Sequence, residues 1–331
     1  MEQKFNPVVK KIPKRPDCAE VYFRHAGDGF LEVVYGDSAP SSNKSLKDII
    51  LASIRVNLMG NIIKEANIPG LVETVPGGES LLYVFDPMVI SLEELVDKVA
   101  AYEEEMESVN DAVLETRIIK LPLAFEHSVV AKAIEKYVNE INPDAFYCKD
   151  NSNLEYIAAY NGISLEELKE KFVKTQWFVG MVGFFPGLPY YYPLDPTCAI
   201  TCPKYNPART WTGEGTVDLA DYCSTIFGVE SSGGYQLVGR TAPIFQANQV
   251  HPAYKDCPCL FKPTDILQYY EATQEEVDAT YEAVANGTYE YDIVPYRFVL
   301  KDWLDFYESL AEETAAFRKQ QDIGRNSVQQ I

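Results

Sequence analysis

The sequence predicts an α+β protein in which a small α/β sandwich is followed by a larger domain of short strands. An amphipathic helical repeat over residues 46–66 lies between short apolar runs that are typical of strands. Glycine and proline are so frequent across residues 183–241 that only short strands joined by tight turns fit this stretch. Helical repeats flank that stretch, so we also expect a helical insertion before it and a helix at the C-terminus.

The first predicted lobe covers residues 21–114 and follows an extended basic arm over residues 1–20. Its strands are expected at 30–35, 71–75 and 81–85. A Pro-Gly pair ends the helix at 46–66, because proline and glycine commonly follow a helix. Ser91 begins a second helix with the Ser-x-x-Glu pattern of a capping box. The order strand, helix, two strands, helix predicts the sandwich.

The second predicted domain covers residues 115–296 and opens with an apolar strand at 115–123. Its helical insertion is expected as three helices, at 129–141, 153–160 and 164–173. A central apolar strand at 176–182 then leads into the stretch rich in glycine and proline. A final helix with a narrow apolar stripe is predicted over 297–322, and a tail over 323–331.

The balance of charge limits the classes of partner. The chain of 331 residues carries a formal net charge of -20, which disfavours binding to nucleic acid or to an anionic membrane surface. No run of 18 apolar residues indicates a membrane span, and the polar N-terminus lacks the apolar core of a secretory signal. We therefore expect a cytoplasmic protein.

The cysteines do not predict a disulfide framework, because their number is odd and they are scattered through a long chain. The seven positions are Cys18, Cys148, Cys198, Cys202, Cys223, Cys257 and Cys259. Cys198 and Cys202, together with Cys257 and Cys259, would give the four ligands of a structural zinc site. Neither pair has the usual C-x2-C spacing, and no histidine lies beside them. We predict reduced thiols and no metal site.

Polar side chains that suit a small anionic or amide-like ligand lie between the turns of residues 183–241. Arg209 and Arg240 are the candidate anion holders, because a guanidinium group binds a carboxylate through two N–H groups. Side chains able to orient a planar amide are Asn206, Thr210, Thr212 and Gln236. Turns that let the backbone approach a ligand are Pro186-Gly187 and Gly233-Gly234. A second interpretation places both arginines in ordinary ion pairs on barrel loops.

Three motifs in this region resemble a known family. GFFPGLPY at 183–190 is similar to the GFxPGFPY signature of allophanate hydrolase subunit 1, a family that includes the B-type subunit of 5-oxoprolinase and sporulation kinase inhibitors. KYNPARTWT at 204–212 and GGYQLVGRT at 233–241 resemble more closely the corresponding carboxyltransferase domain of urea carboxylase. The likeness extends over residues 28–321. It implies a cyclophilin-like β-barrel for the second domain.

The resemblance also implies an activity, namely one half of a biotin-dependent carboxyltransferase that acts on a small urea-, guanidine- or lactam-like compound. An amide-type nitrogen is a poor nucleophile, so the site must stabilise an anion and help to move a proton. Arg209 and Arg240 would hold the anion, while Glu214 and Tyr190 would handle the proton. We expect the loops to converge and to bring both arginines around one small hollow.

The expected donor is carboxybiotin delivered by a partner carrier, since this chain contains no Met-Lys biotin acceptor pair. The family implies a homologous second subunit, either allophanate hydrolase subunit 2 or the C-type subunit of 5-oxoprolinase, with biotin carboxylase and biotin carrier protein as further partners. One alternative is the B-type subunit of an ATP-dependent 5-oxoprolinase, whose nucleotide site would be unconventional because no Walker motif occurs here. Another is a non-enzymatic binding protein of the kinase-inhibitor type.

Two positions depart from the urea carboxylase pattern. Phe184 stands near a position where that pattern has an aspartate, and residues 217–223 replace a glycine-rich run. Both lie in the expected pocket. They point away from urea itself as the substrate while leaving the fold unaffected.

Overall fold

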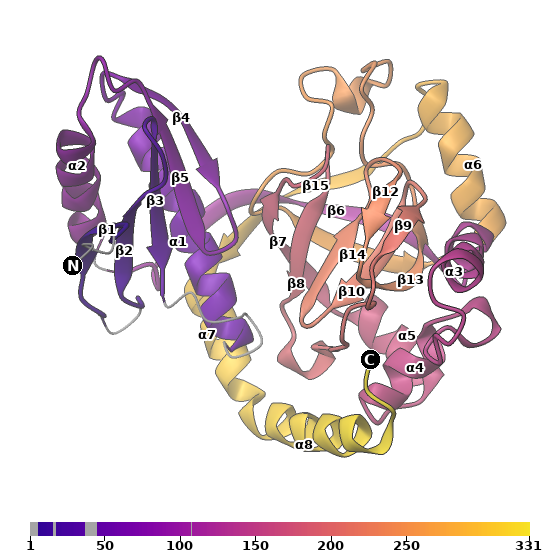
Figure 1. Cartoon of the computed structure of the whole chain (residues 1–331). Coiled ribbons are helices and arrows are strands. Elements are labelled where there is room, and N and C mark those ends of the chain that lie inside the picture. The colour runs from indigo at the N-terminus through magenta and orange to yellow at the C-terminus, as the bar shows by residue number, and fades with distance from the viewer. Residues whose placement is uncertain (1–5, 16–17, 37–44, 107) are drawn as a thin grey trace. The chain divides into compact units, whose positions relative to one another are not determined.

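The computed structural model comprises two compact units, which are described separately below (Figure 1). The residues described are 6–15, 18–36, 45–106 and 108–331. Unit 1 contains residues 1–113 together with 299–301. Unit 2 contains residues 114–298 and 302–331.

Unit 1 is an antiparallel sheet with two helices packed on it, in the strand order β1-β2-β3-β5-β4. Its strands are β1 (Val8–Ile12), β2 (Val21–His25), β3 (Phe30–Tyr35), β4 (Leu71–Pro76) and β5 (Ser80–Phe85). Its helices are α1 (Leu46–Glu65) and α2 (Leu92–Glu105). Alternate residues of β5 are buried and join the core formed with both helices. The capping box predicted at Ser91 is present, with Glu94 as its partner.

The predicted arm is wrong over Val8–Ile12, which form a strand paired with β2. Ile12 is buried in the unit 1 core. One face of this basic segment therefore packs against the core, and the other is exposed to solvent. Residues 1–5 and 16–17 of the same predicted arm lie outside the described residues. The strand is only five residues long and has two lysines at its centre, too short a pattern for the sequence to reveal it.

Unit 2 is built around a closed β-barrel in the strand order β13-β10-β11-β8-β7-β14-β6, with β13 pairing back onto β6. β14 and β6 are parallel, and the other barrel pairs are antiparallel. The first barrel strands along the chain are β6 (Val113–Phe125), β7 (Gln176–Val182), β8 (Pro189–Pro193) and β10 (Thr216–Ala220). The rest are β11 (Cys223–Ile226), β13 (Gln236–Thr241) and β14 (Ile266–Glu271). β15 (Asp292–Val299) adjoins β6 outside the ring.

The helices of this region are α3 (Ser128–Glu140), α4 (Leu154–Tyr160), α5 (Leu165–Lys174), α6 (Gln274–Ala285), α7 (Leu300–Ser309) and α8 (Ala311–Ser327). The single C-terminal helix predicted over 297–322 is therefore two helices, and the predicted tail is helical as far as Ser327. Gly324 explains the extension, because a Cβ there would lie 2.3 Å from the backbone nitrogen of Gly162. Close packing against the end of α4 thus holds the last turns of α8 in place.

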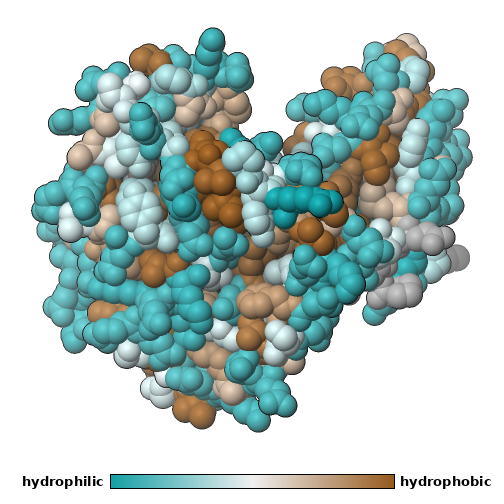
Figure 2. Space-filling view, turned by 180° about the vertical axis from the view of Figure 1, so that it is seen from behind, coloured by the Kyte–Doolittle hydropathy of each residue, from teal (hydrophilic) through white to brown (hydrophobic). Residues whose placement is uncertain are grey.

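Large apolar side chains fill the interior of the barrel, among them Trp177, Tyr191 and Leu219, each with no exposed surface. Hydrophilic residues cover most of the face seen in Figure 2, as the net charge of -20 leads one to expect. Among the residues that the structure describes, no helix is both long enough and apolar enough to cross a membrane.

Candidate functional site

The stretch rich in glycine and proline supplies four barrel strands and a small two-stranded sheet formed by β9 (Arg209–Thr212) and β12 (Ser231–Gly233). We call this pair of strands the β9/β12 ribbon. In its register Arg209 lies opposite Gly233, and Thr212 lies opposite Ser231. The ribbon therefore brings together two motifs that lie more than twenty residues apart in the sequence.

Arg209 is almost completely buried, with 1% of its surface exposed. Its Nε donates to Thr212 Oγ1 at 3.2 Å and its Nη1 donates to the Tyr235 carbonyl at 2.5 Å. The guanidinium carbon lies 4.4 Å from the centre of the Tyr205 ring. Its Nη2 is buried without a hydrogen-bond partner. A cation held this rigidly, with one free donor nitrogen, is suited to an anionic or carbonyl oxygen.

Gly233 leaves the space that this guanidinium group occupies. A Cβ at this position would lie 3.3 Å from Arg209 Nη2 and 2.6 Å from Phe227 Cζ. Any side chain there would have to displace one of these groups. The neighbouring Gly234 has ordinary contacts, since its Cβ would meet Ala208 Cβ at 3.6 Å. Of the pair, only Gly233 occupies a position where the packing requires a glycine.

Asp218 is a buried carboxyl group on β10, with 1% of its surface exposed. Thr225 on β11 donates its hydroxyl to Asp218 Oδ1 at 2.5 Å. Burial raises the pKa of Asp218 to about 7, although the Thr225 hydrogen bond and the Arg209 charge oppose the increase. A carboxyl group that titrates near neutrality can both accept and release a proton, as general acid–base chemistry requires.

Tyr190 belongs to the same face of the sheet as Asp218. Both residues pair with Thr225, one from each neighbouring strand, so the three side chains point to one side. Leu219 and Tyr191 point to the other side, into the core. Burial, followed by the charges of Cys223 and Asp218, raises the pKa of Tyr190 to about 12. Tyr190 therefore keeps its hydroxyl proton at neutral pH.

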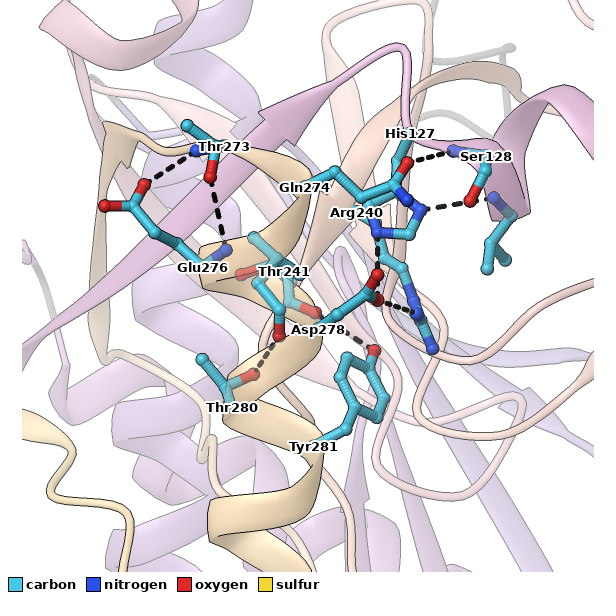
Figure 3. Close-up of polar contacts among 12 residues, drawn as sticks. His127, Ser128, Arg240, Thr241, Thr273, Gln274, Glu276, Asp278, Thr280 and Tyr281 are labelled. Carbon is cyan, nitrogen blue, oxygen red and sulfur yellow. Dashed lines mark hydrogen bonds and ion pairs between the residues drawn. The ribbon is translucent and has the colours of Figure 1, made fainter.

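Arg240 lies in a different network, drawn in Figure 3. Its Nη1 donates to Asp278 Oδ1 at 2.9 Å, and its Nε donates to the Glu214 carbonyl at 3.1 Å. The guanidinium carbon lies 3.8 Å from the centre of the Tyr281 ring. His127 Nε2 contacts the same Asp278 oxygen at 3.1 Å. These contacts attach α6 and the start of α3 to the barrel.

The two predicted anion holders, Arg209 and Arg240, therefore have different interaction partners in the structure. Arg209 interacts with the β9/β12 ribbon and lies close enough to Asp218 to influence its pKa. Arg240 interacts with Glu214, whose own pKa is raised by burial and lowered by the Arg240 charge. Among the contacts of the described residues, the two networks have no residue in common. The second interpretation of the sequence, an ordinary ion pair, describes Arg240 well.

The remaining predicted site residues differ in accessibility. Asn206, Thr210 and Pro186 are exposed at the surface. Gln236 is buried, donates Nε2 to the Pro203 carbonyl at 3.0 Å, and leaves Oε1 without a partner. Gly187 has a φ of +69°, and a Cβ there would lie 2.8 Å from the Phe245 ring. This turn is therefore tightly packed against a neighbouring loop.

Sequence reasoning missed Asp218 as a functional candidate and treated it only as a departure from a family pattern. The available signal was a charged residue in the middle of the apolar strand Thr216–Ala220. A lone aspartate inside a fully buried strand destabilises the fold unless its carboxyl group is neutral or paired. No group of three or more potential metal ligands occurs among the described residues, and all seven cysteines are free.

A family model described as the carboxyltransferase domain, subdomain C and D, matches residues 23–255. The chain belongs to this family. Urea amidolyases from Lachancea kluyveri and Saccharomyces cerevisiae are 30% and 31% identical, over 96% and 95% of this chain. The matches cover 17% of each relative, so the chain spans about a sixth of their length.

A solved structure of the urea amidolyase from K. lactis gives a TM-score of 0.85 at 29% identity, over 98% of this chain and 20% of that one. The B-type subunit of 5-oxoprolinase from Bacillus subtilis is 24% identical, over 76% of this chain and 93% of that protein. The predicted family and the predicted α+β fold with a barrel are thereby confirmed. These similar proteins include enzymes by name.

Proposed function

We propose that this chain is one half of a biotin-dependent carboxyltransferase that acts on a small urea-, guanidine- or lactam-like compound. The observation that supports this most directly is the unpaired Nη2 of buried Arg209, whose charge also acts on Asp218, a carboxyl group with a pKa of about 7. Carboxyl transfer to a weak nitrogen nucleophile requires a fixed cation that stabilises the developing anion and an acid whose pKa lies near neutral pH.

The residues of this site fit a carboxybiotin donor chemically. When bound, carboxybiotin would supply an activated carboxyl group and a ureido oxygen able to accept hydrogen bonds. Arg209 Nη2 is a buried donor without a partner, and it can donate to such an oxygen without giving up its contacts to Thr212 and Tyr235. An orphaned donor in a dry environment favours a ligand that accepts from it.

Proton handling falls to Asp218 in this proposal. Thr225 holds the Asp218 carboxyl group in place through its hydroxyl, and this carboxyl group would accept a proton from the acceptor nitrogen. Tyr190, on the same face, remains protonated and serves as a hydrogen-bond donor that orients the ligand. Arg240 would instead support the barrel, because its contacts to the Glu214 backbone carbonyl and to Asp278 on α6 are already made. Only the backbone of Glu214 takes part in them, so the predicted proton-handling role of its carboxyl group stays a prediction.

A partner protein is part of the proposal. The chain spans about a sixth of the urea amidolyases, and the Bacillus subtilis relative is by name one subunit of an enzyme. We therefore expect a homologous second subunit, of the type of allophanate hydrolase subunit 2 or the C-type subunit of 5-oxoprolinase. Biotin carboxylase and biotin carrier protein would deliver carboxybiotin.

The test uses the native assembly that contains this chain, purified from its source. We expect ADP release that needs both bicarbonate and a urea- or guanidine-type compound, and that avidin abolishes by sequestering biotin. An Arg209→Met assembly should lose this activity. Substrate-dependent ADP release that is indifferent to avidin and bicarbonate would contradict the proposal.

A second candidate function is that of the B-type subunit of a 5-oxoprolinase, with ATP as its cofactor. The GFFPGLPY motif at 183–190 and the 93% coverage of the Bacillus subtilis protein favour it. In that case the native assembly should convert 5-oxoproline and ATP to glutamate and ADP in the presence of avidin. Glutamate formation and avidin sensitivity thus separate the two candidates in one experiment.

A further inference from the structure

The loop that connects β13 to β14 carries two cysteines separated by one proline, Cys257 and Cys259 (Figure 1). Cys257 is exposed and Cys259 is partly exposed, whereas the other five cysteines are buried. The Cys259 N–H donates to Cys257 Sγ at 3.5 Å. The structure therefore holds two accessible sulfur atoms side by side.

This thiol pair contacts the turn of the GFFPGLPY motif. The backbone of Gly187 lies near enough to the Cys259 thiol to lower its pKa. Phe245 bridges to Cys259 through the backbone, and its ring packs against Gly187 so closely that a Cβ there would lie 2.8 Å away. A change at Cys259 Sγ therefore acts directly on a turn that is tightly packed.

We propose that Cys257 and Cys259 form a redox-active dithiol that a peroxide oxidises reversibly to a disulfide, and that this oxidation loosens the turn at Gly187. The exposed Cys257 sulfur attacks one peroxide oxygen, the O–O bond breaks, and a sulfenic acid and hydroxide form. The Cys259 sulfur then attacks Cys257 Sγ and displaces the oxygen as water. Two thiols and one peroxide thus give one disulfide and two waters.

The order of attack follows from accessibility. Burial and the neighbouring Cys257 raise the pKa of the Cys259 thiol to about 11, so Cys259 is the poorer first nucleophile at neutral pH. Cys257 is the more exposed sulfur and meets the oxidant first. Oxidation bonds the Cys259 sulfur to its neighbour and so shifts the residue that bridges to Phe245, whose ring packs on Gly187. This is the physical link between the dithiol and the turn.

The test treats the full chain with increasing hydrogen peroxide, alkylates the remaining thiols after denaturation, and measures the peptides by mass spectrometry. We expect the peptide that contains Cys257 and Cys259 to lose two hydrogen atoms before any other cysteine reacts, and dithiothreitol to reverse the change. Alkylation of both sulfurs after treatment, their conversion to sulfinic acids, or earlier oxidation of a buried cysteine such as Cys198 would overturn the proposal.

Two matched measurements test the link to the turn. Amide hydrogen exchange at Gly187 should become several-fold faster in the oxidised protein and should return to its original rate on reduction. The Cys257→Ser variant, given the same peroxide treatment, should show no disulfide and unchanged exchange at Gly187. Exchange that stays unchanged in oxidised wild-type protein would overturn the link. Neither measurement depends on catalytic turnover, so the inference stands or falls independently of the proposed function.

Discussion

Arg209 and Arg240 look alike in the sequence, yet the barrel uses them differently. Each is followed by threonine, and each lies within four residues of a glycine. Arg209 is 1% exposed and retains a donor nitrogen without a partner, while Arg240 is bonded to Asp278 and the Glu214 carbonyl. A buried donor left unpaired costs about 1–3 kcal/mol, so its retention favours a ligand-binding role. Arg240, whose hydrogen bonds to Asp278 and to the Glu214 carbonyl join two elements, has the contacts of a structural residue.

Replacement of Arg209 by methionine should give the largest effect. The substitution Arg209→Met keeps much of the volume that packs on Tyr205 but removes the free donor. We expect turnover of the native assembly to fall roughly 100- to 1,000-fold, as for the loss of one preorganised donor to an oxyanion. Circular dichroism and the thermal midpoint check that the chain is folded. Turnover within about threefold of wild type in a folded variant would exclude Arg209 from the site.

Asp218→Asn should lower turnover about 100-fold, because general acid–base groups typically contribute that much or more. Its effect on stability has a definite sign. The pKa of Asp218 is about 7 in the fold, compared with about 3.9 in an unfolded chain. Between these values the folded protein holds a proton that the unfolded chain has lost, so stability decreases as pH rises from about 4 to about 7.

The Asp218→Asn variant has no carboxyl group to titrate at this position, so its stability should lack this dependence on pH. Relative to wild type, Asp218→Asn should gain stability across that window, by on the order of 4 kcal/mol in total at about 1.4 kcal/mol per pKa unit. Urea unfolding of both proteins at several pH values measures it. Parallel stability curves for the two proteins would mean that the pKa of Asp218 is not raised.

Gly233→Ala offers a smaller change that leaves the chemistry of Arg209 intact. The new methyl group would lie 3.3 Å from Arg209 Nη2 and 2.6 Å from Phe227 Cζ, so one of them must move. We expect turnover to fall about tenfold and the free energy of unfolding to fall by about 1–3 kcal/mol. Gly234→Ala is the matched control, with an ordinary contact to Ala208, and should change turnover less than twofold. Equal effects of the two substitutions would contradict the role given to Gly233.

The fold was predictable because its signals are local, whereas the site depends on contacts between distant segments. The helical repeat placed a helix at 46–66, and α1 spans Leu46–Glu65. Nothing near Asp218 in the sequence reveals that the carboxyl group will be buried where the Arg209 charge acts on it. Likewise Arg240 pairs with Asp278, which is 38 residues away on another element. Residue types identified the candidates, but only the packing distinguishes a satisfied arginine from an unsatisfied one.

The smallest expected effect concerns the Arg240 network and completes the comparison. A double-mutant cycle of Arg240→Gln and Asp278→Asn should give a coupling energy of about 1 kcal/mol, because the Asp278 side chain is 46% exposed and water screens the pair. Turnover of either single variant should stay within about threefold of wild type, since no contact of either group among the described residues involves Arg209 or Asp218. A loss of turnover in Arg240→Gln comparable with that of Arg209→Met, with stability unchanged, would mean that both arginines serve one site.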